Sequence, residues 1–158
     1  MKTTFVLFFI VSMASSSVRA QNNNSTSNSS SYKNAIGVKF YPGAVSFKHF
    51  FNQQNALELL GYFRNYGTRI TGLYEIHGGI NNTGGLKWYV GPGAHVSLYS
   101  SKYGGGGSIG VDGVIGLDYK IASAPINLSL DWQPSYDFKS FDGFISDWFG
   151  LAIRYTLN

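Results

Sequence analysis

Hydrophobic and polar residues alternate with a period of two along most of the chain after residue 34. In the last stretch, every odd position from Phe149 to Leu157 is apolar, whereas the even positions include Gly150 and Arg154. This alternation is typical of a β-strand with one apolar face. The same pattern predicts eight strands, at about 35–41, 44–51, 56–65, 68–77, 86–99, 107–120, 126–138 and 144–157.

Short segments rich in glycine, proline and asparagine separate the predicted strands, as antiparallel hairpins require. Each strand with its turn takes about 15 residues, which matches a transmembrane β-strand and its loop. We therefore expect an all-β fold, an eight-stranded antiparallel up-and-down transmembrane β-barrel. An even strand number places both termini in the periplasm. The expected periplasmic turns are then 52–55, 78–85 and 121–125, and the outward-facing turns are 42–43, 65–67, 100–106 and 139–143.

Twelve charged residues of the predicted strands lie on the polar face. In a membrane barrel this face lines the lumen, so we predict a lumen charge network made of Lys39, Lys48, Glu58, Arg64, Arg69, Glu75, Lys87, Asp112, Asp118, Lys120, Asp131 and Arg154. Glycines interrupt the same face, which favours a crowded interior over a solvated surface. The alternative is a soluble barrel that turns these charges to water and its apolar face inward.

Hairpin registers suggest particular partners within this network. Lys87 should lie opposite Asp118, and Arg69 should lie near His95. Arg154 should reach Asp131 diagonally across the last hairpin. A register slip of one residue would turn such charges into lipid, so the network would fix strand order.

The apolar face is rich in aromatic residues near the strand ends, where a lipid-facing belt places them. We assign to this belt Trp88, Trp132, Phe149 and Tyr155. His49 breaks the pattern because it lies on the apolar face, and the end of the second strand is the simplest explanation.

Composition narrows the class of protein further. The 158 residues contain no cysteine, 13% charged residues and 20 glycines. The sequence has no apolar run of 18 or more residues, which argues against a helical membrane protein. Without cysteine, neither an acylated lipoprotein anchor nor disulfides nor thiolate metal sites can form.

Residues 1–20 have the features of a cleaved secretory signal peptide, with a basic start, a short apolar stretch and a small-residue end. Residues 21–34 form an Asn/Ser-rich tract that we interpret as a disordered tether, and residues 35–158 form the barrel domain. Loss of Lys2 and Arg19 with the leader lowers the net charge from +4 to +2. No basic run remains, so we do not expect nucleic-acid binding.

Four segments make the sequence resemble small eight-stranded outer-membrane β-barrels of Gram-negative bacteria, of the OmpA/OmpX-like kind. They are PGAVSFKHFF (42–51), LKWYVGPGAHVSLY (86–99), PINLSLDWQPSYDF (125–138) and GLAIRYTLN (150–158). The resemblance implies a bacterial outer-membrane location, reached through the signal peptide. The implied partners are the lipid bilayer, lipopolysaccharide and the outer-membrane insertion machinery, which would recognise the C-terminal strand. That strand ends in Leu157-Asn158 rather than in the usual aromatic residue.

An eight-stranded barrel encloses just enough space for its own side chains, so a structural or adhesive role is expected rather than a pore. We expect no enzymatic activity, no cofactor and no metal site. One alternative is a lipid A-modifying hydrolase or acyltransferase that would use His95 with Ser97, or Glu75 with His77. The other is a soluble periplasmic ligand-binding barrel with Trp88, Leu128 and Trp132 inside.

Overall fold

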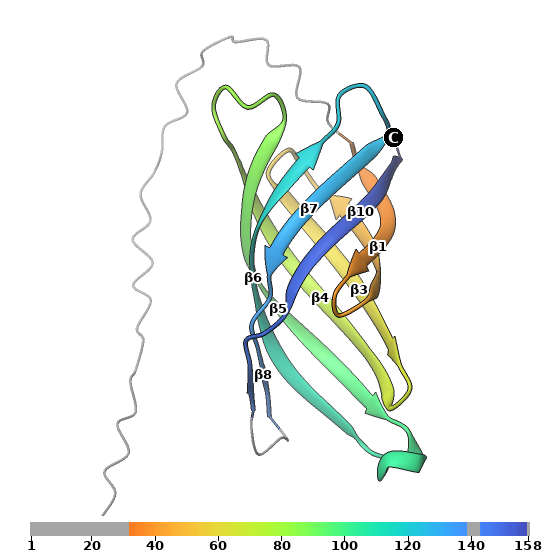
Figure 1. The fold of residues 1–158 in the computed structure, drawn as a ribbon. Helices are drawn as coiled ribbons and strands as arrows, with labels where there is room; N and C mark the ends of the chain where they lie inside the picture. The colour runs from red at the N-terminus through yellow and green to blue at the C-terminus, as the bar shows by residue number, and fades with distance from the viewer. Residues whose placement is uncertain (1–31, 139–142, 158) are drawn as a thin grey trace, which may run out of the picture.

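The strands form one closed antiparallel β-barrel in a computed structural model that describes residues 32–138 and 143–157 (Figure 1). In these ranges no helix is long and apolar enough to cross a membrane. The elements are β1 (Asn34–Phe40), β2 (Ala44–Phe50), β3 (Asn55–Arg64), β4 (Gly67–Gly79), β5 (Leu86–Tyr99), the 3-10 turn η1 (Ser101–Tyr103), β6 (Gly107–Lys120), β7 (Ile126–Trp132), β8 (Ser135–Asp137), β9 (Phe144–Ile145) and β10 (Phe149–Leu157).

Neighbouring strands pair in chain order, and β1 pairs with β10, which closes the barrel. Both β7 and β8 pair with β6, so they are two parts of one strand of the barrel. In the same way, β9 pairs with β8 and β10 pairs with β7. The predicted eight-stranded antiparallel barrel is therefore confirmed.

Two predicted strands were expected to be continuous, and this expectation was wrong. The stretch 126–138 is interrupted at Gln133 and Pro134, and the stretch 144–157 is interrupted at residues 146–148. Proline has no N–H group and cannot donate a ladder hydrogen bond at this position. The Pro134 carbonyl instead accepts a hydrogen bond from Gly113 N at 2.8 Å.

The barrel has two ends that differ in construction. We call one end the terminal mouth. It contains the first and last strand residues, Asn34 and Leu157, and the connections 51–54, 80–85 and 121–125. At the other end, the far mouth, lie the connections 41–43, 65–66 and 100–106. β5 and β6 have 14 residues each, whereas β1 and β2 have seven, so the wall extends further at the far mouth on the β5–β6 side (Figure 1).

The residues that the structure describes begin inside the segment expected to be a tether. Tyr32 is buried in the terminal mouth, where its ring packs edge-on against Phe50 at 5.1 Å. Phe50 N also donates a hydrogen bond to Lys33 O at 2.8 Å. The predicted signal peptide and most of the predicted tether lie outside the described residues.

Glycines on the inner face allow adjacent strands to approach closely. A Cβ added at Gly91 would lie 1.7 Å from Tyr74 O, and one at Gly37 would lie 2.0 Å from Ile153 O. Both contacts involve backbone atoms, which a side-chain rotation cannot relieve. These positions require glycine because any other residue would force the strands apart.

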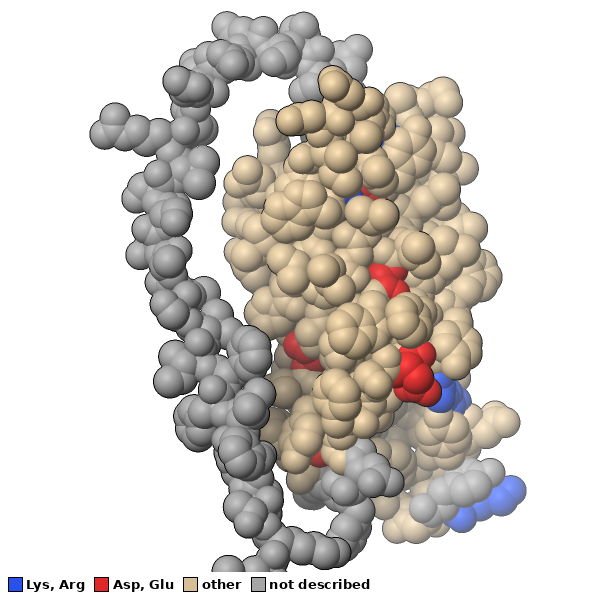
Figure 2. Space-filling view, turned by 60° about the vertical axis from the view of Figure 1, so that its left-hand side comes forward, with Lys and Arg blue, Asp and Glu red and all other residues tan. Residues whose placement is uncertain are grey.

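The outer surface of the barrel is apolar and its interior is polar. Leu130, Ile153 and Ile70 are 56%, 41% and 59% exposed, whereas Glu58 and Lys48 are fully buried. Figure 2 shows one face, where uncharged residues form most of the surface and charged groups occupy small patches. A soluble barrel has the opposite arrangement. The soluble alternative required Trp88 and Trp132 inside, and the structure places both on the outer surface.

Candidate functional site

The charged side chains of the strands converge on the lumen. Of the 12 residues predicted to form the lumen network, nine are buried, namely Lys39, Lys48, Glu58, Arg69, Glu75, Asp112, Asp118, Asp131 and Arg154. Asp137, which was not predicted, is also buried. Within the described residues the lumen therefore holds four buried lysines and arginines and six buried carboxylates. Buried charges are tolerated only when they are paired and hydrogen-bonded, so their contacts determine whether the lumen is stable.

Arg154 forms the centre of the network. Its guanidinium makes an ion pair with Glu58, which lies on the opposite side of the lumen on β3. Its Nε donates to Ser46 Oγ at 2.6 Å, and its Nη1 donates to Ser129 Oγ at 2.8 Å and to Asn127 Oδ1 at 3.1 Å. One arginine thus connects β2, β3, β7 and β10 across the interior.

Two lysines make the other central ion pairs. Lys48 Nζ lies 2.8 Å from Glu75 Oε2 and 3.4 Å from Asp118 Oδ2. Lys39 Nζ lies 2.6 Å from Asp131 Oδ1. Tyr89 donates its hydroxyl to the other oxygen of Asp131 at 2.7 Å. Each of these contacts joins two strands that are not neighbours in the sheet. The paired side chains therefore extend across the lumen.

The predicted pairing of Arg154 with Asp131 was wrong. Arg154 bonds to Glu58 and Asp131 bonds to Lys39, because both arginine and lysine reach across the lumen rather than along their own hairpin. The predicted register of Lys87 opposite Asp118 is correct, but their side chains separate. Asp118 turns inward to Lys48, whereas Lys87 Nζ donates to Gln53 O at 3.3 Å.

Three members of the predicted network lie at the mouths and are only partly buried. Lys87 and Lys120 lie at the terminal mouth, where Lys120 Nζ donates to the carbonyls of Ile121 and Ala124. Arg64 lies at the far mouth and donates to the Tyr66 hydroxyl. None of the three makes an ion pair with a carboxylate among residues 32–138 and 143–157.

Histidines extend the network toward both mouths. Toward the terminal mouth, His77 Nε2 lies 2.8 Å from Glu75 Oε2. Toward the far mouth, His95 Nδ1 lies 2.7 Å from Asp112 Oδ2, and Arg69 Nη2 lies 2.6 Å from the other Asp112 oxygen. Arg69 Nη2 and His95 Nδ1 are 3.0 Å apart, which agrees with the prediction that these residues are neighbours.

His49 is the penultimate residue of β2, in agreement with the expected strand end. Its Nδ1 lies 2.7 Å from Asn34 Oδ1, so it joins β2 to the start of β1. Its ring also packs edge-on against Phe51 at 5.2 Å. This position gives His49 a structural role at the terminal mouth.

The residues suggested for catalysis do not assemble into a nucleophile–base–acid array within the described ranges. His95 contacts Asp112 through Nδ1, and its Nε2 faces Asp137 at 3.6 Å. No hydrogen bond joins Ser97 to His95, although a triad requires the nucleophile within hydrogen-bond reach of the base. In the described part of the chain, no group of three or more His, Asp or Glu residues could hold a metal ion.

Neutral side chains, which the predicted charge network did not include, complete the lumen. Tyr62 and Lys39 both donate to Gln133 Oε1 at 3.1 Å. Trp148 turns inward at the far mouth and packs on Tyr62 with ring centroids 5.0 Å apart. Trp148 has the same parity as Gly150 and Arg154, so continued alternation was the signal that could have identified it.

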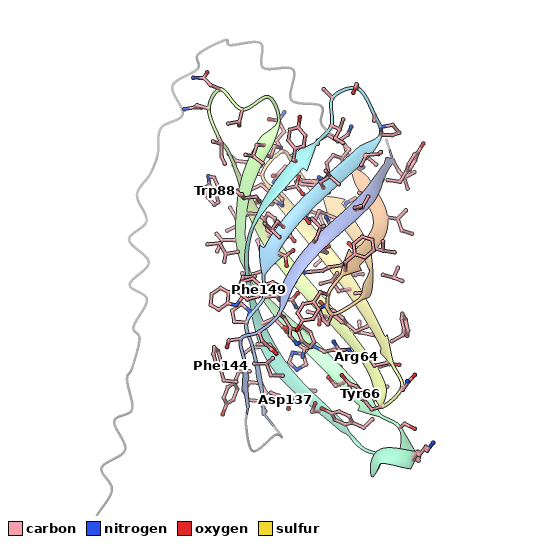
Figure 3. The ribbon with its side chains drawn as sticks, viewed as in Figure 1. Arg64, Tyr66, Trp88, Asp137, Phe144 and Phe149 are labelled. Carbon is pink, nitrogen blue, oxygen red and sulfur yellow. The ribbon has the colours of Figure 1, made fainter. Side chains whose placement is uncertain are left out.

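The residues assigned to the lipid-facing belt all lie on the outer surface. Trp88 is 43% exposed and Trp132 is 36% exposed, and Figure 3 shows Trp88 and Phe149 pointing away from the barrel. Trp132 and Phe149 stack with ring centroids 6.4 Å apart. Tyr155 is also exposed, near the terminal end of β10.

The barrel fold resembles that of a protein of known structure. The structure is similar to the crystal structure of the N-terminal β-barrel domain of Pseudomonas aeruginosa OprF, with a TM-score of 0.58 and 18% sequence identity. The similarity covers 78% of this chain and 95% of that chain. The chain has an outer-membrane β-barrel fold. Comparisons with protein-family models and with curated protein sequences give no match.

Proposed function

We propose that this protein is an integral barrel of the bacterial outer membrane with a closed, charge-paired lumen and a structural or adhesive role. The observation that carries the proposal is the inverted distribution of side chains, with ion pairs such as Arg154–Glu58 inside and residues such as Leu130 exposed outside. Only lipid makes an apolar exterior of this extent favourable. Closure of the sheet also satisfies the backbone polar groups that lipid cannot satisfy.

The partners follow from the same distribution. The outer face would contact the bilayer and the acyl chains of lipopolysaccharide, with Trp88 and Trp132 at the interfaces. The alternating apolar face of β10, from Phe149 to Leu157, is the segment that we propose for recognition by the insertion machinery. The similarity in fold to the OprF domain supports an outer-membrane location.

A closed lumen predicts that the barrel does not conduct ions steadily. Across the lumen, Lys39, Gln133 and Tyr62 form one layer, and Arg154 with Glu58 forms another. We expect single-channel recordings of the refolded protein in planar bilayers to show no long-lived open state above background at 100 mV. A stable open channel in most insertions would contradict the closed lumen.

A further inference from the structure

We propose that the far mouth of the barrel binds a phosphate group between the guanidinium groups of Arg64 and Arg69. These two residues lie on β3 and β4, beside the inward-facing ring of Trp148. The proposal concerns this mouth alone and does not depend on whether the lumen conducts.

A pocket of about 130 Å³ opens at this mouth. Arg64, Arg69 and Trp148 line it together with Tyr66, Tyr99 and other residues of β3 to β5, β8 and β9. In Figure 3, Arg64, Tyr66 and Asp137 are labelled in this lower part of the barrel. The pocket is smaller than the ~300–1,000 Å³ of sites for drug-sized ligands, so it suits a single compact group such as phosphate.

Arg64 provides a positive charge that no carboxylate of the described residues neutralises. Its Nη1 donates to the Tyr66 hydroxyl, and its Nη2 makes only a long contact of 3.5 Å with Pro42 O. Among the described residues, no carboxylate lies within 4.0 Å of this guanidinium. A partly buried arginine without a counter-ion is a favourable site for an anion.

Arg69 supplies the second cation from the floor of the pocket. Its Nη2 bonds to Asp112 at 2.6 Å, and its Nε bonds to Thr71 Oγ1 at 3.3 Å. Its Nη1 has no hydrogen-bond partner among the described residues and is not sealed from solvent. This nitrogen is therefore free to donate to a ligand oxygen.

Both guanidinium groups lie within cation–π distance of the Trp148 ring. The Arg69 Cζ lies 4.3 Å from the centre of the indole ring, and the Arg64 Cζ lies 5.5 Å from it. Stacking on an aromatic face restrains a guanidinium without consuming its N–H donors. Both guanidinium groups thus keep N–H donors available. A phosphate has more acceptor oxygens than a carboxylate and can therefore bond to more of these donors.

One carboxylate, that of Asp137, also lines the pocket, and its charge is partly offset by its neighbours. It accepts a hydrogen bond from Ser108 Oγ at 2.6 Å and faces His95 Nε2 at 3.6 Å. The phosphate could belong to a dissolved molecule or to a lipid headgroup. Both sources have the same chemistry, and the experiment separates them.

The test uses Trp148 as its own reporter. Because the chain has three tryptophans, the Trp88→Phe/Trp132→Phe variant retains only Trp148. The full-length protein is refolded in neutral detergent, and inorganic phosphate is added at constant ionic strength. We expect a saturable change in fluorescence. Arg64→Gln should raise the Kd at least about tenfold, because it removes a charge-assisted donor pair.

Lys87→Gln is the matched control, because it removes one cation at the terminal mouth, at the other end of the barrel. At that distance salt screens the charge, so the Kd should stay within about twofold of the wild-type value. Arg64→Lys keeps the charge but removes the fork, so its Kd should lie between those of wild type and Arg64→Gln. Heat-modifiable gel migration verifies that each variant is folded.

A second titration uses bicelles of phosphatidylcholine with increasing phosphatidic acid. Saturation by inorganic phosphate supports a dissolved ligand, and saturation by phosphatidic acid alone supports a lipid headgroup. The proposal is overturned if neither probe gives a saturable response. It is also overturned if Arg64→Gln and Lys87→Gln change the response equally.

Discussion

Replacement of Arg154 by methionine should lower the free energy of unfolding by about 3–5 kcal/mol, because it leaves a buried carboxylate without its partner. Glu58 is fully buried, and its Oε1 pairs with Arg154 and accepts a hydrogen bond from Ser46 Oγ at 2.6 Å. Its Oε2 has no hydrogen-bond partner in the described structure. The substitution would also remove the donors that reach Ser46 and Ser129. Urea-induced unfolding in lipid vesicles, followed by tryptophan fluorescence, measures the change.

Arg64→Met provides a matched control for this prediction. Arg64 also points inward, but it lies at the far mouth, is partly exposed and makes no ion pair with a described carboxylate. Its replacement should therefore cost less than about 1 kcal/mol. Equal losses in the two variants would show that the Arg154–Glu58 pair has no special role.

A double variant separates the cost of the unpaired carboxylate from the loss of packing. In Arg154→Met/Glu58→Leu no charge is left unpaired, so part of the stability lost in Arg154→Met should return. The recovery should be incomplete because Ser46 and Asn127 still lose hydrogen bonds from Arg154. If the double variant is less stable than the sum of both single changes, the pair is not the source of the loss.

An arginine on the outer face should also be costly. Ile153 lies in the middle of β10, opposite Val38 on β1 and Leu128 on β7, and its side chain is exposed. If this surface contacts acyl chains, Ile153→Arg should lower the free energy of unfolding in vesicles by about 2–4 kcal/mol. The same urea titration measures this loss.

Asn81→Arg is the control for charge alone, since Asn81 lies in the exposed connection between β4 and β5 at the terminal mouth. This substitution should change stability by less than about 0.5 kcal/mol. A soluble surface would tolerate both arginines alike. Equal and small effects at Ile153 and Asn81 would therefore contradict contact with lipid.

The strand number and the inward or outward direction of the side chains were predictable because they depend on local alternation alone. Arg154 and Ile153 are adjacent in sequence and necessarily face opposite sides of the sheet. One further argument decided which face points to the lumen: charges inside the barrel can pair with one another, whereas charges that face lipid cannot. The break at Pro134 did not follow in the same way, because a proline does not by itself end a strand in this barrel: Pro92 lies within the continuous strand β5.

The ion-pair partners were not predictable in the same way. Arg154 and Glu58 are 96 residues apart and lie on strands that are not neighbours in the sheet. Which strands face each other across a lumen depends on the tilt and stagger of the whole barrel, and local register does not contain that information. Hairpin reasoning therefore placed Arg69 near His95 correctly but assigned Arg154 to the wrong carboxylate.

The far mouth shows a second limit of sequence reasoning. Arg64 was expected to belong to the lumen charge network. It lies instead where β3 is no longer paired with β2, and it has no acidic partner among the described residues. The pairing of β2 with β3 ends at Gly61, so Tyr62 and Arg64 pair with β4 but have no partner on β2. A strand pattern gives the face of a residue but not its depth along the barrel.

The native tryptophans allow the most direct test of the central claim that the apolar face contacts lipid and the charged face does not. Single-tryptophan variants that retain Trp88, Trp132 or Trp148 are refolded into vesicles whose acyl chains carry bromine, a contact quencher of indole fluorescence. Trp88 and Trp132 lie on the outer surface, whereas Trp148 packs inward on Tyr62. Strong quenching of the first two, with little quenching of Trp148, is the predicted result. Absence of quenching at Trp88 and Trp132, or equal quenching of all three, would contradict it.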